Sequence, residues 1–440
     1  MLEKKWNFAT KAVHAGWRSD PATGSFGLPM YVTAGYRFED GDHAMRLFNM
    51  EEEGHLYSRI SNPTVEVFEK AVAQCEGGVD AVATSSGQAA LMHALLCLCS
   101  AGDHIVVAAK SYGGTLTLVK NLLGKLGIDS TVVDTDDVEA VRQSVKPNTR
   151  CVITETIGNP CLNVAPLEEL AAVTEEHNIP LVVDNTFASP ALCRPIEWGA
   201  NVVIHSVTKY ISGHGQIIGG VIVDGGNMDW QRTDKWPVLT EPDPSYHGVV
   251  FTEKFGNAAL AAKIKVSILR DAGGCLSPFN ALMAKTGLST LHLRMERHSL
   301  NALSVSKFLE GHQMVEWVSY PGLESSPSYE KGQKYLPNGA GGMVAFCIKG
   351  GLKAGKAFME GLELFSCVAN LGDVRSMAIH PASTTHGQLT PQERKACGIE
   401  EGLIRLSVGI EDVEDILADL ERALEKAQRE AGPNAGIAKE

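Results

Sequence analysis

The feature that most constrains the fold is a regular alternation of short β-branched runs with helical segments between about residues 100 and 225. The run 180–184, Pro-Leu-Val-Val-Asp, is apolar up to its last residue, as expected for a strand that is covered on both faces. This alternation predicts an α/β fold in which helices flank a mostly parallel central sheet. Strands are predicted at 104–109, 131–134, 150–155, 180–184, 201–205 and 219–223, and helices at 114–126, 136–145 and 166–177.

The segments on either side of this region have a different pattern. The first 62 residues show little periodicity and many Gly, Pro and aromatic residues, which predicts an arm rather than a domain. We predict a large domain over 63–270 and a smaller C-terminal α/β domain over 271–440, with the last eight or so residues frayed. Further helices are predicted at 65–75, 86–99 and 411–430 and within a long helical region at 255–312, and further strands at 342–349 and 403–408.

The composition is that of a globular enzyme-sized chain. Of its 440 residues 44% are hydrophobic and 21% charged, which excludes disordered and fibrous classes. The formal charge of −13 disfavours a nucleic-acid partner, and the apolar runs are too short to span a bilayer. The ten cysteines form no Cys-x-x-Cys pair, and Cys97, Cys151 and Cys347 lie in apolar runs. With no signal-peptide pattern at the N-terminus, this usage predicts reduced thiols and a cytoplasmic location.

Several common site motifs are missing. The sequence has no triphosphate-binding Gly-x-x-x-x-Gly-Lys-Ser/Thr motif, and Gly213-His-Gly215 is spaced wrongly for a dinucleotide fingerprint. His380 and His386 are six residues apart in a loop that contains proline, which does not suit a metal site. We therefore predict no metal.

Three other features suggest a ligand site. Asp184 ends a strand that is expected to be buried, where a carboxylate is costly unless a cation pairs with it. Ser206-Val-Thr208-Lys209 follows another strand, so two hydroxyls and an amine are expected at the same carboxyl edge of the sheet, where ligands bind. Ser86-Gly87-Gln88 opens a predicted helix whose first N–H groups can hold a phosphate.

Each feature taken alone has a structural explanation. Asp184 is also consistent with a turn cap or an ion pair, Lys209 with a surface lysine, and Ser86-Gly87 with an ordinary helix cap. Together they supply a phosphate anchor, a carboxylate for a ring nitrogen and a lysine amine. Those are the three groups that pyridoxal phosphate needs.

The stretch Ser206-Val-Thr-Lys209-Tyr-Ile-Ser-Gly-His-Gly resembles the cofactor-lysine motif of the Cys/Met-metabolism family of pyridoxal-phosphate enzymes, which have fold type I. The resemblance runs nearly end to end. Its other motifs stand in family order: Tyr57-Ser-Arg59-Ile-Ser-Asn62-Pro63-Thr64, Ser85-Ser86-Gly87, Tyr112-Gly113-Gly114-Thr115, Asn159-Pro160, Asp184-Asn185-Thr186 and Arg405-Leu-Ser-Val-Gly-Ile-Glu. Within the family the chain resembles the O-acetylhomoserine sulfhydrylase branch, through Glu155-Thr-Ile-Gly-Asn-Pro, Gly225-Gly-Asn-Met-Asp-Trp230, Tyr246-His-Gly248, Ala369-Asn370-Leu-Gly-Asp373 and His380-Pro-Ala-Ser-Thr-Thr-His386.

The resemblance implies a role for each matched residue in binding the cofactor. Lys209 would carry pyridoxal phosphate covalently and move protons, and Asp184 would keep the pyridine nitrogen protonated. Tyr112 would stack on the ring, and Asn159 would contact the ring hydroxyl. The phosphate would be bound by Gly87, Gln88, Ser206 and Thr208.

The resemblance also implies a substrate site and an assembly. Arg405 would bind the substrate α-carboxylate through two parallel hydrogen bonds, with support from Asn370. Tyr57 and Arg59 in the arm would reach the phosphate of a neighbouring subunit, and Tyr57 would also face the substrate. A homo-oligomer, usually a dimer of dimers, is implied, with an amino acid and sulfide or a small thiol as substrates.

The implied reaction is γ-replacement on O-acetyl-L-homoserine, which gives homocysteine or methionine plus acetate. The alternatives are a methionine γ-lyase or cystathionine γ-synthase type of activity, and γ-replacement by a non-sulfur nucleophile in a specialised pathway. A non-catalytic homologue and a binding module remain as further classes. Methionine γ-lyases carry cysteine where this chain has Gly114. Val32, Gly35 and Ser289 depart from the sulfhydrylase pattern, so acetyl, succinyl and phospho leaving groups all stay open.

Overall fold

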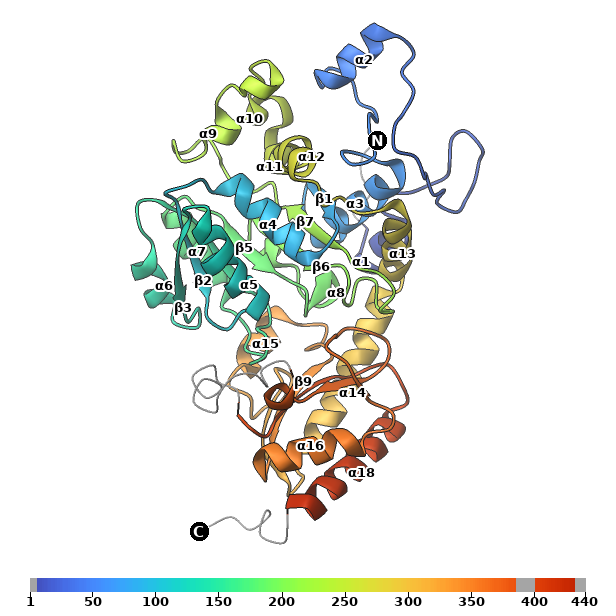
Figure 1. Cartoon of the computed structure of the whole chain (residues 1–440), viewed down its shortest axis with the longest axis vertical. Helices are drawn as coiled ribbons and strands as arrows, with labels where there is room; N and C mark the ends of the chain where they lie inside the picture. Colours follow the sequence, from blue (N-terminus) through green and yellow to red (C-terminus); the bar gives the residue numbers. More distant parts are fainter. Residues whose placement is uncertain (1–5, 385–399, 432–440) are drawn as a thin grey trace. The chain divides into compact units, whose positions relative to one another are not determined.

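The computed structural model describes residues 6–384 and 400–431 (Figure 1), and these form two compact units. Unit 1 comprises Met1–Thr156, Ala165–Ser212 and Gln216–His292, and unit 2 comprises Ile157–Val164, Gly213–Gly215 and Leu293–Glu440. This division follows the packing of the chain. The predicted division into an arm and two domains, at 62/63 and 270/271, stays a prediction.

Unit 1 contains a seven-stranded sheet in the order β1-β7-β6-β5-β4-β2-β3. The five strands from β6 to β3 are parallel, whereas β7 runs antiparallel to both β1 and β6. The predicted mostly parallel α/β sheet is therefore confirmed. Its strands are β1 (Asp80–Thr84), β2 (His104–Ala108), β3 (Asp129–Val133), β4 (Thr149–Glu155), β5 (Leu181–Asp184), β6 (Val202–Ser206) and β7 (Gly220–Asp224).

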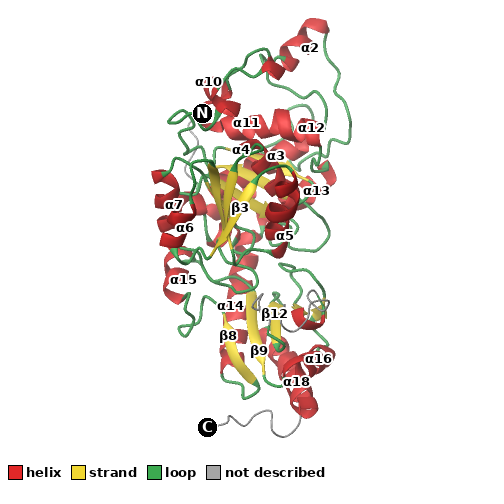
Figure 2. Ribbon diagram, turned by 60° about the vertical axis from the view of Figure 1, so that its left-hand side comes forward, coloured by secondary structure: helices red, strands yellow, loops and turns green. Residues whose placement is uncertain are grey.

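Helices flank this sheet on both sides, with α6 and α7 on one side of the strands and α5 on the other (Figure 2). The main ones after the arm are α3 (Pro63–Glu76), α4 (Gly87–Leu98), α5 (Gly113–Thr117), α6 (Val138–Ser144), α7 (Leu167–Glu176), α8 (Ser189–Leu192), α11 (Ala259–Lys263) and α13 (Pro278–Ser289). The predicted helical region 255–312 is interrupted, because Gly273 and Gly274 both take φ near +77° and a new helix is capped by Ser277. The arm is less irregular than predicted, since it forms α1 (Phe8–His14) and α2 (Gly41–Phe48).

Unit 2 contains a five-stranded sheet in the order β10-β11-β12-β9-β8. Its core includes the rings of Phe346 and Phe358, which meet edge-on with centroids 5.5 Å apart. The strands are β8 (Val315–Ser319), β9 (Met343–Ile348), β10 (Ser366–Cys367), β11 (Met377–Ile379) and β12 (Leu403–Ser407). The principal helices are α14 (Leu291–Glu310), α15 (Tyr329–Tyr335), α16 (Gly351–Gly361) and α18 (Val413–Ala431).

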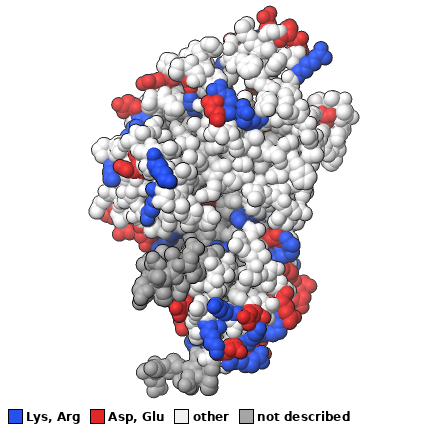
Figure 3. Space-filling view, in the orientation of Figure 1, with Lys and Arg blue, Asp and Glu red and all other residues white. Residues whose placement is uncertain are grey.

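Burial agrees with the cysteine pattern in the sequence. Cys97, Cys151 and Cys347 are all buried, and burial raises the thiol pKa of Cys97 to about 12. Within residues 6–384 and 400–431, no helix is long and apolar enough to cross a membrane. On the face drawn in Figure 3, basic side chains lie among acidic ones rather than in one continuous area. His386 and the C-terminal segment predicted to fray lie outside the described residues.

Asn62 joins the arm to the first long helix of unit 1. Its side-chain oxygen caps α3 by accepting from the backbone N–H of Thr64 at 3.0 Å. Its side-chain nitrogen donates to Tyr31 O at 2.9 Å, to Tyr36 Oη at 3.1 Å and to Ser58 Oγ at 3.0 Å. Asn62 is 1% exposed, so the bond to Thr64 is buried and the other three bonds are partly shielded from water.

Asn62→Ala should therefore lower the free energy of unfolding of unit 1 by about 3 kcal/mol, since it removes a helix cap and leaves several buried groups unpaired. The matched control is Ser277→Ala, which removes only the exposed cap of α13 and should cost about 1 kcal/mol. Urea titrations of both variants test this. Equal shifts of the unfolding midpoint would contradict the anchoring role of Asn62.

Candidate active site

Asp184 lies at the carboxyl edge of the unit 1 sheet, at the end of β5. In the strand register it is opposite Glu155 of β4 on one side and Ile204 of β6 on the other. One carboxylate oxygen accepts from the backbone N–H of Thr186 at 2.9 Å, and the Thr186 hydroxyl accepts from Ser206 N at 2.8 Å. The predicted meeting of Asp184 with the Ser206 segment at one sheet edge is therefore observed within unit 1.

The turn after β6 carries the predicted lysine. Lys209 is partly buried, and its backbone N–H donates to Ser206 O at 3.1 Å, which closes the turn. The Thr208 hydroxyl accepts from Gly219 N at 3.0 Å and donates to Gly219 O at 3.3 Å. To bind a phosphate, that hydroxyl hydrogen would have to leave the Gly219 carbonyl. The predicted phosphate contacts of Ser206 and Thr208 stay predictions.

The N-terminus of α4 lies against this edge. Ser86 caps the helix by accepting from Ala89 N at 3.1 Å, so the N–H groups of Gly87 and Gln88 begin the helix without an acceptor in the preceding turn. A Cβ on Gly87 would lie 2.8 Å from Ser206 Cβ, and one on Gly220 would lie 2.1 Å from Ser86 O. Glycine at both positions is therefore what lets the helix start approach β6 and β7 so closely.

Tyr112 stands beside this helix start and is 49% exposed. Its backbone N–H donates to Glu155 Oε1 at 2.6 Å, and Gln88 Nε2 donates to Gly114 O at 3.0 Å. A Cβ on Gly114 would lie 2.3 Å from Tyr112 Cε1 and 3.0 Å from Gln88 Nε2. Gly114 thus leaves the space that the tyrosine ring occupies.

Unit 2 carries the predicted carboxylate-binding residue. Arg405 lies in the middle of β12, between Ile379 of β11 and Ala345 of β9. Its Nη1 donates to Asn159 Oδ1 at 3.0 Å. Asn159 is thus placed with Arg405, and its predicted contact with the ring hydroxyl stays a prediction.

The remaining predicted residues lie in loops. Asn370 lies in the segment between β10 and β11, where Gly372 N donates to Ser407 Oγ of β12 at 2.9 Å. Tyr57 and Arg59 lie in the arm, where the Arg59 guanidinium is 5.2 Å from the centroid of the Tyr57 ring. Both are exposed. Their contribution to a neighbouring subunit stays a prediction.

Burial dominates the electrostatics of Asp184. Desolvation raises the pKa of its carboxyl group, against the lowering effects of the Thr186 hydrogen bonds and of His205. A half-buried carboxylate of this kind is stabilised by a cationic partner. The protonated nitrogen of a pyridine ring is such a partner.

The residues present fit pyridoxal phosphate on these observations. Unit 1 places a half-buried carboxylate, a lysine and the N-terminus of a twelve-residue helix at one edge of its sheet. The close approach of Gly87 to Ser206 makes a shallow backbone cradle that a side chain would fill. A phosphate suits that helix start, and the ring nitrogen suits Asp184.

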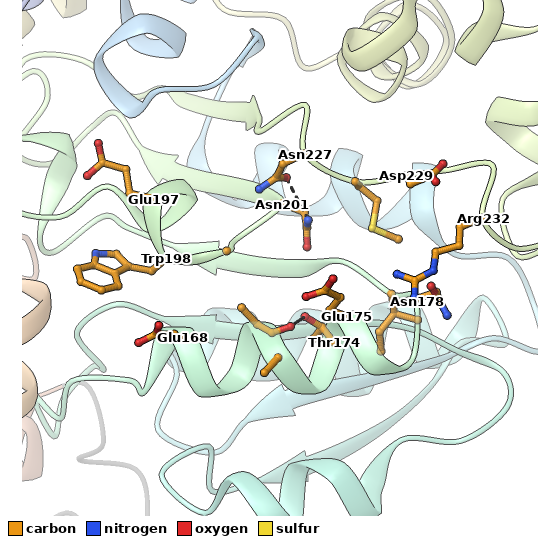
Figure 4. Close-up of a pocket in the computed structure, with 15 residues that line it drawn as sticks. Glu168, Thr174, Glu175, Asn178, Glu197, Trp198, Asn201, Asn227, Asp229 and Arg232 are labelled. Atoms are coloured by element: carbon orange, nitrogen blue, oxygen red, sulfur yellow. Dashed lines mark hydrogen bonds between the residues drawn. The ribbon is translucent and has the colours of Figure 1, made fainter.

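A polar pocket lies elsewhere in unit 1 (Figure 4). It is lined in part by Ile179, Asn201 and Asn227, which stand at the amino ends of β5 and β6 and after β7. Asn201 Nδ2 donates to Asn227 Oδ1 at 3.0 Å there. Since Asp184 and Ser206 end the same strands, the pocket belongs to the opposite edge of the sheet from the candidate active site.

Two functional candidates were missed at the sequence level. Glu155 ends the buried strand β4, as Asp184 ends β5. A carboxylate at the end of such a strand is costly unless a cation pairs with it, so Glu155 was as good a candidate as Asp184. Thr186 fixes both Asp184 and Ser206 through its backbone and hydroxyl groups. In the sequence Thr186 is only one residue of a motif. No local pattern predicts that its hydroxyl accepts from Ser206 N, twenty residues away.

The sequence is similar to a known enzyme family and to named relatives over most of its length. The sequence matches the family model "Cys/Met metabolism PLP-dependent enzyme" over residues 9–425. It is 49% identical to the O-acetyl-L-homoserine sulfhydrylase of Leptospira meyeri, over 94% of this chain and 96% of that protein. It is 48% identical to the homocysteine synthase of Schizosaccharomyces pombe, over 96% of this chain and 99% of that protein.

A similar solved structure is that of a protein assigned as an O-acetylhomoserine (thiol)-lyase from Campylobacter jejuni. The TM-score is 0.92 and the sequence identity 36%, over 96% of this chain and all of that chain. That structure contains N'-pyridoxyl-lysine-5'-monophosphate.

Gly87→Ala should weaken the binding of pyridoxal phosphate by at least about tenfold, because the new methyl group would push α4 away from Ser206. Gly124→Ala is the matched control, since a Cβ there meets no atom within 4 Å. Equilibrium titration of the cofactor-free proteins, followed by absorbance, measures the affinity. Unchanged affinity in Gly87→Ala would show that this helix start does not bind the phosphate.

Asp184→Asn should stabilise the cofactor-free protein near neutral pH by about 1 kcal/mol, because it removes a partly desolvated charge. Since folding raises the pKa of Asp184, the folded wild type loses stability relative to the variant as pH rises above about 3.9, the ordinary unfolded value. The difference should vanish at lower pH. Turnover with the cofactor should fall by at least about a hundredfold.

Thermal unfolding of both cofactor-free proteins across this pH range is the test, and Asp137→Asn at an exposed helix cap is the control. If Asp184→Asn destabilised the protein at neutral pH, the carboxylate would be a structural group instead.

Proposed function

This chain belongs to the Cys/Met metabolism family of PLP-dependent enzymes, and from this premise we propose that it catalyses γ-replacement on O-acetyl-L-homoserine. Sulfide or a small thiol replaces acetate, and the product is homocysteine or methionine. The observation that carries the proposal is similarity to named sulfhydrylases and homocysteine synthases over nearly the full length of both chains. The geometry of the candidate active site supports it.

Pyridoxal phosphate, when bound, supplies the electron sink for the negative charge that develops on the substrate carbon. We propose that Lys209 holds the cofactor covalently, while the first N–H groups of α4 bind its phosphate. Asp184 holds the proton on the pyridine nitrogen. Tyr112 covers the face of the pyridine ring. Glu155 holds its backbone N–H, and the absence of a side chain at Gly114 leaves room for its ring.

Arg405 binds and orients the substrate. Its planar guanidinium suits a two-pronged bond to the α-carboxylate, and the contact with Asn159 Oδ1 restricts its rotation. Such a bond restricts the orientation of the bound substrate. Gly372 and Ser407 tie the loop of Asn370 to the strand of Arg405, which supports a role for Asn370 near the same carboxylate.

Lys209 is the proposed proton carrier. With the cofactor bound, the Lys209 amine would carry a proton away from Cα of the substrate and, once unprotonated again, would serve as the base at Cβ. Loss of the Cβ proton accompanies departure of acetate from Cγ, and addition of sulfide at Cγ with return of the protons completes the exchange. The net reaction is O-acetylhomoserine plus hydrogen sulfide giving homocysteine plus acetic acid.

The lyase alternative shares Lys209, Asp184 and Tyr112. It differs in that no nucleophile adds at Cγ after the leaving group has departed. The observation that favours replacement is the space at Gly114, because any side chain there would displace the Tyr112 ring. Ser289 and Val32, which depart from the sulfhydrylase pattern, lie outside this machinery. Ser289 Oγ donates to Thr286 O at 2.6 Å within α13, and Val32 is 74% exposed in the arm.

We also propose a cytoplasmic homo-oligomer, a dimer of dimers, in which the arm contacts a neighbouring subunit. Large apolar side chains of the arm are exposed in the single chain, with Phe26 86% and Val32 74% accessible. Such side chains favour a protein contact over water. Tyr57 and Arg59 in the same arm supply a phenol and a cation suited to a phosphate.

The test of the proposed function is product analysis with O-acetylhomoserine, with and without sulfide. We expect homocysteine and acetate in equal amounts, and only when sulfide is present. A keto acid and ammonia formed without sulfide would establish the lyase activity instead. Neither product from a protein that binds the cofactor would refute the proposed substrates.

Lys209→Ala should abolish turnover and the covalent link to the cofactor, whereas Lys120→Ala, at an exposed helical lysine, should change neither. Mass spectrometry after borohydride reduction detects the link. Full activity in Lys209→Ala would overturn the entire assignment.

A further inference from the structure

A second group of buried ionisable side chains lies in unit 1, and the proposed function does not use it. Glu76, the last residue of α3, is 0% exposed, and His205 of β6 is 1% exposed. Glu76 Oε1 lies 2.5 Å from His205 Nε2, and it also accepts from Asn185 Nδ2 at 2.8 Å. A carboxylate with no access to water is costly unless a cation compensates it.

This pair lies on the reverse face of the strands that form the candidate active site. Successive residues of a strand point to opposite faces, so His205 faces away from the side on which Ser206 meets Gly87. Asn185, the residue after Asp184, is turned to the same reverse face by its bond to Glu76. Its backbone N–H donates to Ile204 O at 2.9 Å, which fixes the end of β5 against β6.

The side chain of Asn185 is held by three hydrogen bonds, which restrict the backbone at the end of β5. Its side-chain nitrogen donates to Glu76 and to Cys193 O at 2.9 Å, and its side-chain oxygen accepts from Thr156 Oγ1 at 2.8 Å. Three elements therefore hold the residue that directly follows Asp184. Asn185, the residue next to Asp184 in the chain, is thus linked to Glu76 directly and to His205 through Glu76.

Two thiols and three basic side chains lie in the surroundings of the pair. In the part of the chain that the structure describes, the other two polar atoms of the pair, Glu76 Oε2 and His205 Nδ1, are buried and have no hydrogen-bond partner. The thiols of Cys75 and Cys193 adjoin Glu76, and burial together with the Glu76 charge raises the pKa of both, so they stay neutral. Lys285, Lys11 and Arg194 act on these thiols from farther away. Among the described residues, His205 is the basic side chain within ion-pair distance of Glu76.

We propose that Glu76 and His205 form a buried hydrogen-bonded pair that, through Asn185, positions Asp184 to bind the pyridine nitrogen. The inference rests on the proposed role of Asp184 in binding pyridoxal phosphate. Both residues are positioning residues, since neither touches the cofactor or the reacting atoms. A charge on His205 would lower the pKa of Asp184, against the larger effect of burial.

The experiment compares the holoenzymes of His205→Gln, Glu76→Gln and a matched control, His104→Gln. His104 is a buried histidine of the same sheet that contacts Thr149 Oγ1 and Thr131 Oγ1, both at 2.8 Å, and has no part in the site. The readouts are the cofactor dissociation constant, the pH midpoint of the cofactor absorbance and the thermal unfolding temperature.

His205→Gln and Glu76→Gln should each weaken cofactor binding by about tenfold, the size typical when a residue that orients a ligand is lost. Each should raise the absorbance midpoint by about half a pH unit or more, because the Lys209 nitrogen loses the acidifying effect of a protonated ring. His104→Gln should change neither quantity. Midpoints and affinities equal to those of the control would overturn the proposal.

A measurement on the wild type removes any dependence on the folding of the variants. Nitrogen NMR of histidine-labelled holoenzyme should show a histidine Nε2 in a strong hydrogen bond, as the 2.5 Å contact with Glu76 requires. Its absence would also overturn the proposal. If the wild type binds the cofactor but makes no homocysteine, the proposed function fails while these comparisons still decide the role of the pair.

Discussion

The half-buried carboxylate of Asp184 at the end of β5 is the constraint on which the rest of unit 1 depends. A carboxylate there raises the free energy of the folded chain, as the upward pKa shift from desolvation shows. The surrounding residues reduce that cost without removing the charge. Thr186 donates from its backbone, and the Glu76–His205 pair lies on the reverse face. A cationic ring nitrogen is the ligand that such a prepared carboxylate favours.

The same edge of the sheet gathers its other groups by strand geometry. Parallel strands end together, so Glu155, Asp184 and Ser206 are brought to one edge although 51 positions separate the first from the last. The antiparallel β7 then brings Gly220 beside Ser206 and against the start of α4. The proposed phosphate site thus depends on two glycines whose missing side chains allow the start of α4 to approach β6 and β7 closely.

Much of this could be predicted from the sequence, because periodicity and strand ends are local signals. The apolar run before Asp184 indicated a strand covered on both faces, and the hydroxyls and amine after β6 indicated a ligand edge. The break at Gly273 and Gly274 was not predicted, since the flanking segments have the same helical periodicity. The arm helices α1 and α2 were missed because they are short and largely exposed.

Contacts between distant residues explain what the sequence could not show. Glu76 and His205 are 129 positions apart, and Asn159 and Arg405 are 246 apart. In a single sequence each reads as an ordinary polar residue at the end of a helix or within a strand. The structural role of each residue depends on its partner. An isolated buried charge is costly, whereas a paired polar group can orient its neighbours. The residues proposed to touch the cofactor and substrate could be named from motif order. The residues that position these groups can be identified only from the three-dimensional structure, because their partners are distant in the sequence.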